Sequence, residues 1–166
     1  MALFDFPMKP KNGTLAFEDA TGTPISATIQ FEDGDLQHDE MRAGYFDVEI
    51  LQDRGVDWIA VETNEQRIGF TFSCYATDFY DATEKTFPDM VMKTGAWAAG
   101  VSTLGANRPW ALKMTYTQEQ SAYGAGADSV MVFTKVLVWY AFAEAGTGKF
   151  TCRGIIFNPS ATITRS

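Results

Sequence analysis

Apolar and polar residues alternate along most of this chain. In the segment 68–75, Ile68, Phe70, Phe72 and Cys74 alternate with glycine, threonine, serine and tyrosine. Successive side chains of a strand point to opposite faces of a sheet, so this period of two predicts a strand with one buried face. Similar segments bounded by turn residues predict further strands over 14–18, 25–31, 45–51, 57–62, 110–117, 129–143, 149–157 and 161–165.

One segment, 86–94, has the signals of a short helix. Thr86 is a suitable N-cap, Pro88 suits the first turn, and Asp89 complements the positive end of the helix dipole. Gly95 is suited to end the helix, because glycine adopts the left-handed conformation without strain. The sequence therefore predicts one helix among many strands.

This order of elements predicts a mainly β fold. We expect a β-sandwich or barrel-like core of about eight to ten strands, with one short flanking α-helix. The 166 residues are enough for a single domain, 1–166, with its own hydrophobic core. Within it, residues 1–13 are interpreted as an N-terminal arm and residues 32–44 as a long loop.

The strand expected at 129–143 is apolar on both faces over most of 130–142. An antiparallel strand commonly turns one face to water, so a strand without a polar face needs cover on both sides. We expect the core of the protein to cover one face and something else to cover the other.

An acidic segment, 32–40, interrupts the strand pattern. Its carboxylates belong to Glu32, Asp33, Asp35, Asp39 and Glu40. A long charged arm that extends from a sheet indicates contact with other copies of the chain rather than catalysis.

Net charge differs between the two parts of the chain. Residues 1–66 carry 14 acids and 4 bases, a net charge of −10, whereas residues 67–166 carry a net charge of +2. Two interpretations remain open: solvated faces that happen to differ, or an acidic and a mildly basic surface that guide head-to-tail stacking. The total of −8 argues against ordinary nucleic-acid binding, which needs Lys and Arg to displace counterions.

Residues suited to catalysis are sparse. His38, the single histidine, lies inside the acidic segment, and no nucleophile-elbow pattern is present. A zinc site of His38, Cys74 and Cys152 lacks the usual spacing, and Asp33 and Asp35 lack the spacing of a calcium loop. We therefore expect no enzymatic activity, no metal and no cofactor. The cysteines are interpreted as two buried free thiols, and a disulfide between them is the open alternative.

The chain shows no targeting or membrane-spanning pattern. Its first seven residues lack a basic region before an apolar run, and no apolar run approaches about 20 residues. We expect no membrane anchor, and a protein made in a cytoplasm and kept there until assembly or release.

Four stretches in the first half of the chain follow one another in a recognisable order. They are Asn12–Asp19 followed by Gly22–Pro24, then Phe31–Leu36, then Asp53–Val56, and finally Phe70–Ser73 with Thr77–Phe79. In this order they resemble a bacteriophage tail tube protein (major tail protein) of the long, non-contractile tail type, a family related in fold to type VI secretion tube proteins.

The resemblance implies a structural virion protein of the phage tail, made in the cytoplasm of the host bacterium. Copies would form hexameric rings that stack into a tube, and DNA would pass through its channel during infection without specific binding. The partners would be further copies and other tail proteins, namely the tape measure, the tail terminator and the distal tail or baseplate proteins.

The resemblance also implies roles for two sets of residues. The family's long loop between the second and third strands reaches a neighbouring subunit, and here it would contain Glu32, Asp33, Asp35, Leu36, His38, Asp39, Glu40, Met41 and Arg42. The family's channel is usually lined by acids, which repel the phosphates of DNA. The first candidates for such a lining are Asp47, Glu49, Glu62 and Glu18.

Two alternatives remain open. A small-molecule-binding β-barrel of the lipocalin type fits the length and strand number, with Phe46, Phe70, Phe72 and Trp139 as candidate cavity residues. A capsid decoration or head-to-tail joining protein belongs to the same virion class as the tube subunit.

Overall fold

The computed structural model describes residues 13–29, 36–39, 46–52, 58–65, 67–76, 79–106, 108–119, 128–144, 148–157 and 162–165. Its strands are β1 (Gly13–Glu18), β2 (Ser26–Ile29), β3 (Gln37–His38), β4 (Phe46–Gln52), β5 (Trp58–Glu65), β6 (Ile68–Tyr75), β7 (Leu112–Gln118), β8 (Ser129–Ala143), β9 (Lys149–Ile156) and β10 (Thr162–Arg165). Helix α1 (Phe87–Met92) and the 3₁₀ turn η1 (Gly95–Trp97) lie between β6 and β7. The expected mainly β fold with one short helix is confirmed.

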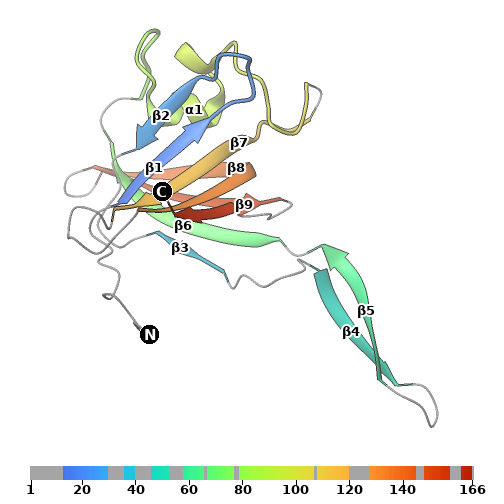
Figure 1. The fold of residues 1–166 in the computed structure, drawn as a ribbon. Helices are drawn as coiled ribbons and strands as arrows, with labels where there is room; N and C mark the ends of the chain where they lie inside the picture. Colours follow the sequence, from blue (N-terminus) through green and yellow to red (C-terminus); the bar gives the residue numbers. More distant parts are fainter. Residues whose placement is uncertain are drawn as a thin grey trace.

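Eight strands form one antiparallel sheet in the order β2-β1-β7-β8-β9-β6-β3, and β10 also pairs with β8 (Figure 1). The long strand β8 is shared between two parts of this sheet. Its residues Ser129–Val136 pair with β7, whereas Val136–Ala143 pair with β9. We call β2, β1, β7, β10 and the beginning of β8 the first half-sheet. The end of β8 with β9, β6 and β3 is the second half-sheet.

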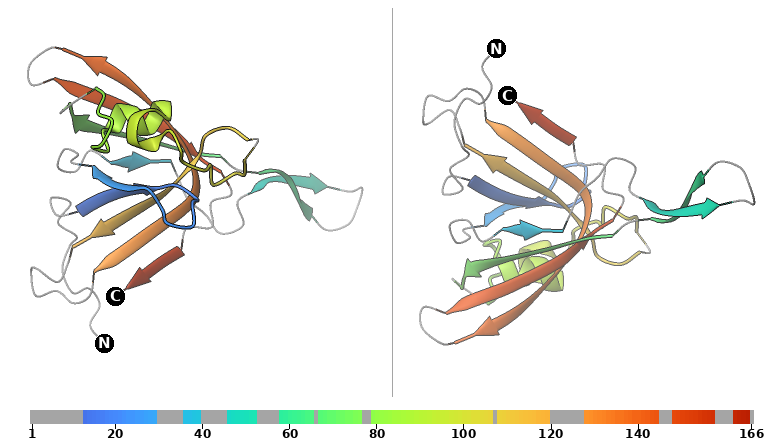
Figure 2. Two further views of the ribbon diagram at one scale, coloured as in Figure 1. Left: turned by 90° about the horizontal axis from the view of Figure 1, so that it is seen from above. Right: turned by 90° about the horizontal axis from the view of Figure 1, so that it is seen from below.

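The sheet is folded so that the inner faces of the two half-sheets meet. Phe17 of β1 stacks on Phe72 of β6 with ring centroids 6.2 Å apart, although β7, β8 and β9 separate these strands in the sheet. Figure 2 shows this curvature from above and from below. The core is therefore sandwich-like, and it is built from one folded sheet.

Alternating residues on the inner faces supply the core. Leu15 and Phe17 of β1 are fully buried, and Phe72 of β6 is 1% exposed. Complete burial of a side chain of this size contributes about 1.5–3 kcal/mol. The period of two in the sequence thus predicted which residues of these strands face inward.

Helix α1 begins as the sequence predicts and ends earlier. Thr86 is the N-cap, and its hydroxyl accepts a hydrogen bond from the backbone N–H of Asp89 at 3.2 Å. The helix ends at Met92, because Lys93 adopts the left-handed conformation with φ 57°. The expectation that the helix reaches residue 94 and ends through Gly95 is wrong. Gly95 instead begins η1 with φ 50°, where an added Cβ would lie 2.5 Å from the carbonyl oxygen of Asp81.

A buried carboxylate holds the segment around α1 together. Asp89 is completely buried and accepts hydrogen bonds from the hydroxyls of Thr94 at 2.6 Å and Thr86 at 2.8 Å, and from the backbone N–H of Asp81 at 2.9 Å. Burial, the largest single influence, raises the pKa of Asp89, but these hydrogen bonds together lower the pKa below its usual value. The ionised form is thus favoured in the folded protein.

Asp19 plays a similar part at the turn between β1 and β2. Its carboxylate accepts hydrogen bonds from the backbone N–H of Ile25 at 2.7 Å and of Val101 at 2.9 Å. Burial raises the pKa of Asp19 and is the largest influence, but hydrogen bonds from Val101, Ile25 and Thr21 bring the net pKa below its usual value. This residue joins the first half-sheet to the connection between η1 and β7.

β4 and β5 lie apart from the folded sheet. They pair with each other as a separate two-stranded sheet, and Figure 1 shows this hairpin projecting away from the body of the molecule. The alternating pattern predicted these strands correctly but carried no information about their place. We call the described residues of these two strands, 46–52 and 58–65, the projecting hairpin; residues 53–57 lie outside the described part.

The segment 32–44, interpreted from the sequence as one loop, contains the short strand β3. Gln37 is paired with Thr71 of β6, and His38 with Phe70. Two residues are too few for a recognisable alternation, so only the pairing with β6 shows this strand. The parts 32–35 and 40–44 lie outside the described residues.

Candidate assembly interface

The projecting hairpin is the clearest candidate for contact with another molecule. A two-stranded hairpin alone is marginally stable in water and needs further strands or a packed face. Within it, Val48 is paired with Glu62 and Glu49 with Val61. Residues 46–65 contain six acids and one base, a net charge of −5. The hairpin therefore combines apolar residues with a strong negative charge on an element that leaves the core.

The hairpin also contains three of the four acids proposed for a channel lining. Asp47 and Glu49 lie in β4, and Glu62 lies in β5. The structure thus groups these three acids on the projecting element, whereas the fourth, Glu18, belongs to the folded sheet. Their role in a channel stays a prediction.

Glu18 is ion-paired. Its Oε2 lies 2.7 Å from Nζ of Lys113, and the register pairs the two residues directly across β1 and β7. This ion pair neutralises the negative charge of Glu18, which was a candidate for an acidic channel lining that repels DNA. Sequence reasoning missed Lys113, because the two residues are 95 positions apart in the chain and leave no local signal.

Three residues of the proposed inter-subunit loop are described, and they lie at the edge of the second half-sheet. Leu36 packs against the hydrophobic core. His38 belongs to β3, and the backbone N–H of Asp39 donates to the carbonyl of Gly69 at 2.9 Å. The Asp39 carboxylate accepts the backbone N–H of Gly69 at 2.8 Å. These contacts make this part of the segment an edge of the sheet.

The other members of the proposed loop set lie outside the described residues. They are Glu32, Asp33, Asp35, Glu40, Met41 and Arg42. The expected contact of this acidic segment with a neighbouring subunit stays a prediction.

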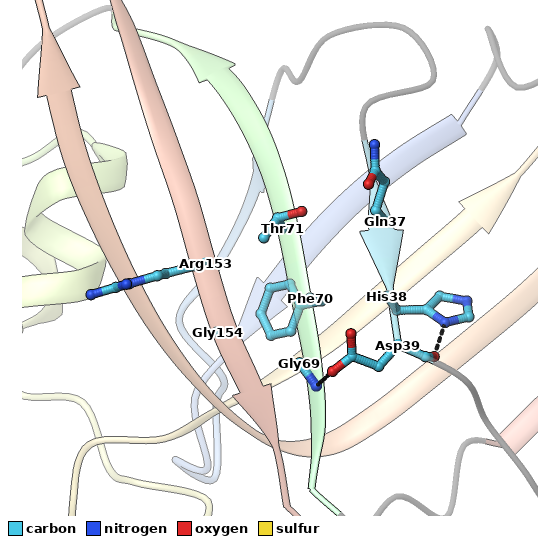
Figure 3. Close-up of a pocket in the computed structure, with 8 residues that line it drawn as sticks. All are labelled: Gln37, His38, Asp39, Gly69, Phe70, Thr71, Arg153 and Gly154. Carbon is cyan, nitrogen blue, oxygen red and sulfur yellow. Dashed lines mark hydrogen bonds between the residues drawn. The ribbon is translucent and has the colours of Figure 1, made fainter.

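An open depression of about 290 Å³ lies beside β3 and is drawn in Figure 3. Its polar lining includes Gln37, His38, Asp39 and Arg153. The Arg153 side chain points away from the carboxylate of Asp39. Nδ1 of His38 lies 2.8 Å from the backbone carbonyl oxygen of Asp39. The side chains drawn do not converge as a nucleophile, a base and an orienting group would.

A second gap, of about 110 Å³, lies inside the fold between the half-sheets. Its lining includes Leu36, Phe70, Met114 and Phe133. Pockets for small molecules typically measure about 300–1,000 Å³. Among the lipocalin-type cavity residues, Phe72 is packed in the core, and Trp139 is 43% exposed. The side chain of Phe46 lies outside the description. These observations give the lipocalin-type alternative no support.

Strand β8 presents apolar side chains to both faces, as its sequence predicts. Phe133 and Val136 are buried in the core, whereas Trp139, on the opposite face, is 43% exposed. Phe142 shares the inner face with Phe150 of β9, but at the strand end it is also 43% exposed. At this end of β8, Phe142 contacts Phe79 at 4.8 Å between ring centroids, and Phe79 is 53% exposed. Exposed aromatic side chains in contact with one another favour a partner surface.

The part of the chain that the structure describes contains no group of three or more His, Cys, Asp or Glu side chains placed to hold a metal ion. The calcium candidates Asp33 and Asp35 lie outside this part. Cys74 and Cys152 are buried thiols with their sulfur atoms 3.7 Å apart. No described helix has the length and apolar character required to span a membrane.

Comparison with solved structures identifies chains of the same fold. A chain from the cryo-EM structure of an extracellular contractile injection system, the PVC sheath/tube terminator in the extended state, has a TM-score of 0.59 and 9% identity. The match covers 96% of this chain and 97% of that chain. A chain from the PVC sheath-tube complex in the extended state has a TM-score of 0.56 and 8% identity, covering 97% and 93%.

Sequence identities this low establish similarity of fold alone. No protein-family model matches the sequence, and no curated protein matches it. The role of this chain therefore has to be argued from its own surfaces.

Proposed function

We propose that this protein is a structural subunit of a tail, either of a phage or of a related injection system. Copies of it assemble into stacked, hexameric rings that form a tube around a channel for DNA. The observation that carries the proposal is the projecting hairpin, which pairs only with itself among the described strands. A hairpin that leaves the core of one copy is suited to pack on the next.

Two further observations support assembly. The exposed aromatic residues Phe79, Trp139 and Phe142 offer apolar surface that a neighbouring copy would bury. Residues 46–65 carry a net charge of −5, whereas residues 67–166, which are only part of the body, carry +2, so this part of another copy is the one electrostatically suited to the hairpin. A heterologous contact of this kind produces rings or open stacks rather than a closed dimer.

The shared fold supports the choice of a tail. The two solved chains come from structures of a sheath/tube terminator and of a sheath-tube complex in a contractile injection system. The narrower expectation of a non-contractile tail draws no support from these contractile systems, and it stays a prediction. In our proposal the protein is made in the cytoplasm of the host bacterium and ends in the tail of the virion. It meets the tape measure, terminator and baseplate proteins there, and it has no enzymatic activity.

The proposal is tested by assembly of the purified protein. Electron microscopy of the concentrated protein should show rings or tubes, and native mass spectrometry should show six-fold or open-ended species. A variant in which a short Gly-Ser linker replaces residues 46–65 should fold, with an unchanged melting profile, and remain monomeric.

Matched controls separate the shape of the hairpin from its charge. The triple variant D47N/E49Q/E62Q keeps the hairpin and removes three charges, so it should assemble with a weaker dependence on salt. Normal polymerisation by the linker variant would show that the hairpin is not an assembly element. A wild-type protein that stays monomeric in every condition would rule out the tube itself.

A further inference from the structure

The outer face of the first half-sheet is rich in threonine. Burial of Leu15 and Phe17 on the inner face turns their neighbours on β1 outward. The pairing register then places five residues side by side across five strands, namely Thr28, Ala16, Thr115, Val132 and Thr162.

A second row runs beside the first. The register brings together Thr14 of β1, Thr117 of β7, Val130 of β8 and Thr164 of β10. Thr14, Thr28, Thr162 and Thr164 are exposed. We call these two rows the threonine face. Its side chains are small, branched or hydroxylated, so the face presents hydroxyl and methyl groups and no long flexible side chain.

The threonine face has no net charge in a chain whose total charge is −8. Neither row contains a charged residue. Beside the first row, the nearest charges along β1 and β7 are Glu18 and Lys113, which neutralise each other at 2.7 Å. Beyond the second row, Glu119 follows β7 and Asp128 precedes β8 in the chain. The two rows themselves, which contain no charged residue, neither attract nor strongly repel phosphate groups.

The outer face of the second half-sheet differs from the threonine face because it carries cations and exposed aromatic rings, both of which bind DNA. Arg153 of β9 is paired with Trp139 of β8, and Lys149 lies over the ring of Tyr75 at 5.6 Å from its centroid. Trp139 and Tyr75 are 43% and 44% exposed. Cations displace the counterions of phosphates, and aromatic rings stack on bases, so this face would retain DNA.

We infer that the threonine face lines the channel, so that DNA passes over uncharged hydroxyl groups instead of an acidic wall. The inference rests on the proposed tube and names which surface of the subunit meets the passing polyanion. Without cations, DNA releases no counterions on contact, and hydroxyl groups that stay hydrated offer no specific grip on phosphates. The second half-sheet then faces neighbouring subunits or the outside of the tube.

Labelling of single cysteines in the assembled protein tests this placement. Thr28→Cys lies on the threonine face, and Thr71→Cys is its matched control on the exposed outer face of the second half-sheet. In assembled tubes, Thr28→Cys should react with N-ethylmaleimide but not with a maleimide that carries a large polyethylene glycol. Thr71→Cys should be less protected from the large reagent, and both variants should react with it as monomers. The buried native cysteines make wild-type protein the background control.

Reaction of Thr28→Cys with the large reagent in tubes would overturn the inference, and so would failure to react with either reagent. If no tube forms, the proposed function fails first, and the inference fails with it.

A second measurement uses retention of short labelled DNA by assembled tubes. Thr28→Lys and Thr164→Lys should raise retention at low salt, with a steep loss as salt increases, whereas wild type releases the DNA. Unchanged release by both lysine variants in intact tubes would also overturn it.

Discussion

The body of the molecule and the projecting hairpin differ in how their strands are stabilised. In the body, Phe17 and Phe72 meet across a folded sheet, and each is almost fully buried. In the hairpin, β4 and β5 have only each other as described pairing partners. The comparison teaches that the core of this chain and the element proposed here for assembly are different parts of the molecule. The hairpin, which pairs with no described strand of the main sheet, is the element we propose to contact a neighbour.

The largest expected contrast is between one core residue and one hairpin residue. Phe17→Ala removes a fully buried ring that contacts Phe72, and it should cost about 3–5 kcal/mol of unfolding free energy. Ile50→Ala in β4 should change the stability of the monomer by less than about 0.5 kcal/mol, because β4 pairs only with β5 among the described strands. Urea unfolding of dilute protein measures both. A comparable loss for Ile50→Ala would mean that the hairpin belongs to the core of its own chain.

Acid should affect the body through its two buried carboxylates. The pKa values of Asp19 and Asp89 lie below the usual 3.8, so their ionised forms stabilise the fold above about pH 4, and this contribution is lost as pH falls through the lowered values. Asp89→Asn should cost about 1–3 kcal/mol at pH 7, because hydrogen bonds to a buried charge are weakened. Its unfolding free energy should also fall less between pH 5 and pH 3 than that of wild type. Equal acid sensitivity of wild type and variant would show that other groups control this range.

The smallest expected effect is at the surface ion pair of the body. Glu18→Gln removes one partner of a pair whose side chains are 31% and 39% exposed, so solvent already screens much of the attraction. The loss of stability should be below about 1 kcal/mol and should shrink further in high salt. Thermal melting with and without added salt measures it. A loss of several kcal/mol would mean that the pair organises the first half-sheet.

Strand alternation predicted much of the fold because burial on one face is a local, repeated signal. Ile68 to Cys74 and Leu15 to Phe17 show this, and so does the N-cap at Thr86, whose partner Asp89 lies three residues away. The sequence did not predict the helix end, because Lys93 adopts the left-handed conformation, which residues other than glycine rarely adopt.

The candidate surfaces were predicted less well, because they depend on which distant segments meet. The register alone pairs Glu18 with Lys113 and aligns the threonines of β2, β1, β7 and β10. The sequence predicted that the acidic segment 32–40 forms an arm, whereas its described residues, 36–39, lie at the edge of the sheet. The element that leaves the body is the hairpin that follows it.

By itself the sequence determined a mainly β chain, the inward residues of strands such as β1 and β6, the start of its helix and its uneven charge. These properties follow from periodicity and composition, which act over a few residues at a time. The tertiary structure decided that one sheet folds on itself at β8, that β4 and β5 leave it, and that threonines gather on one uncharged face. Those outcomes depend on pairing between strands far apart in the chain, and no local pattern encodes which strands will pair.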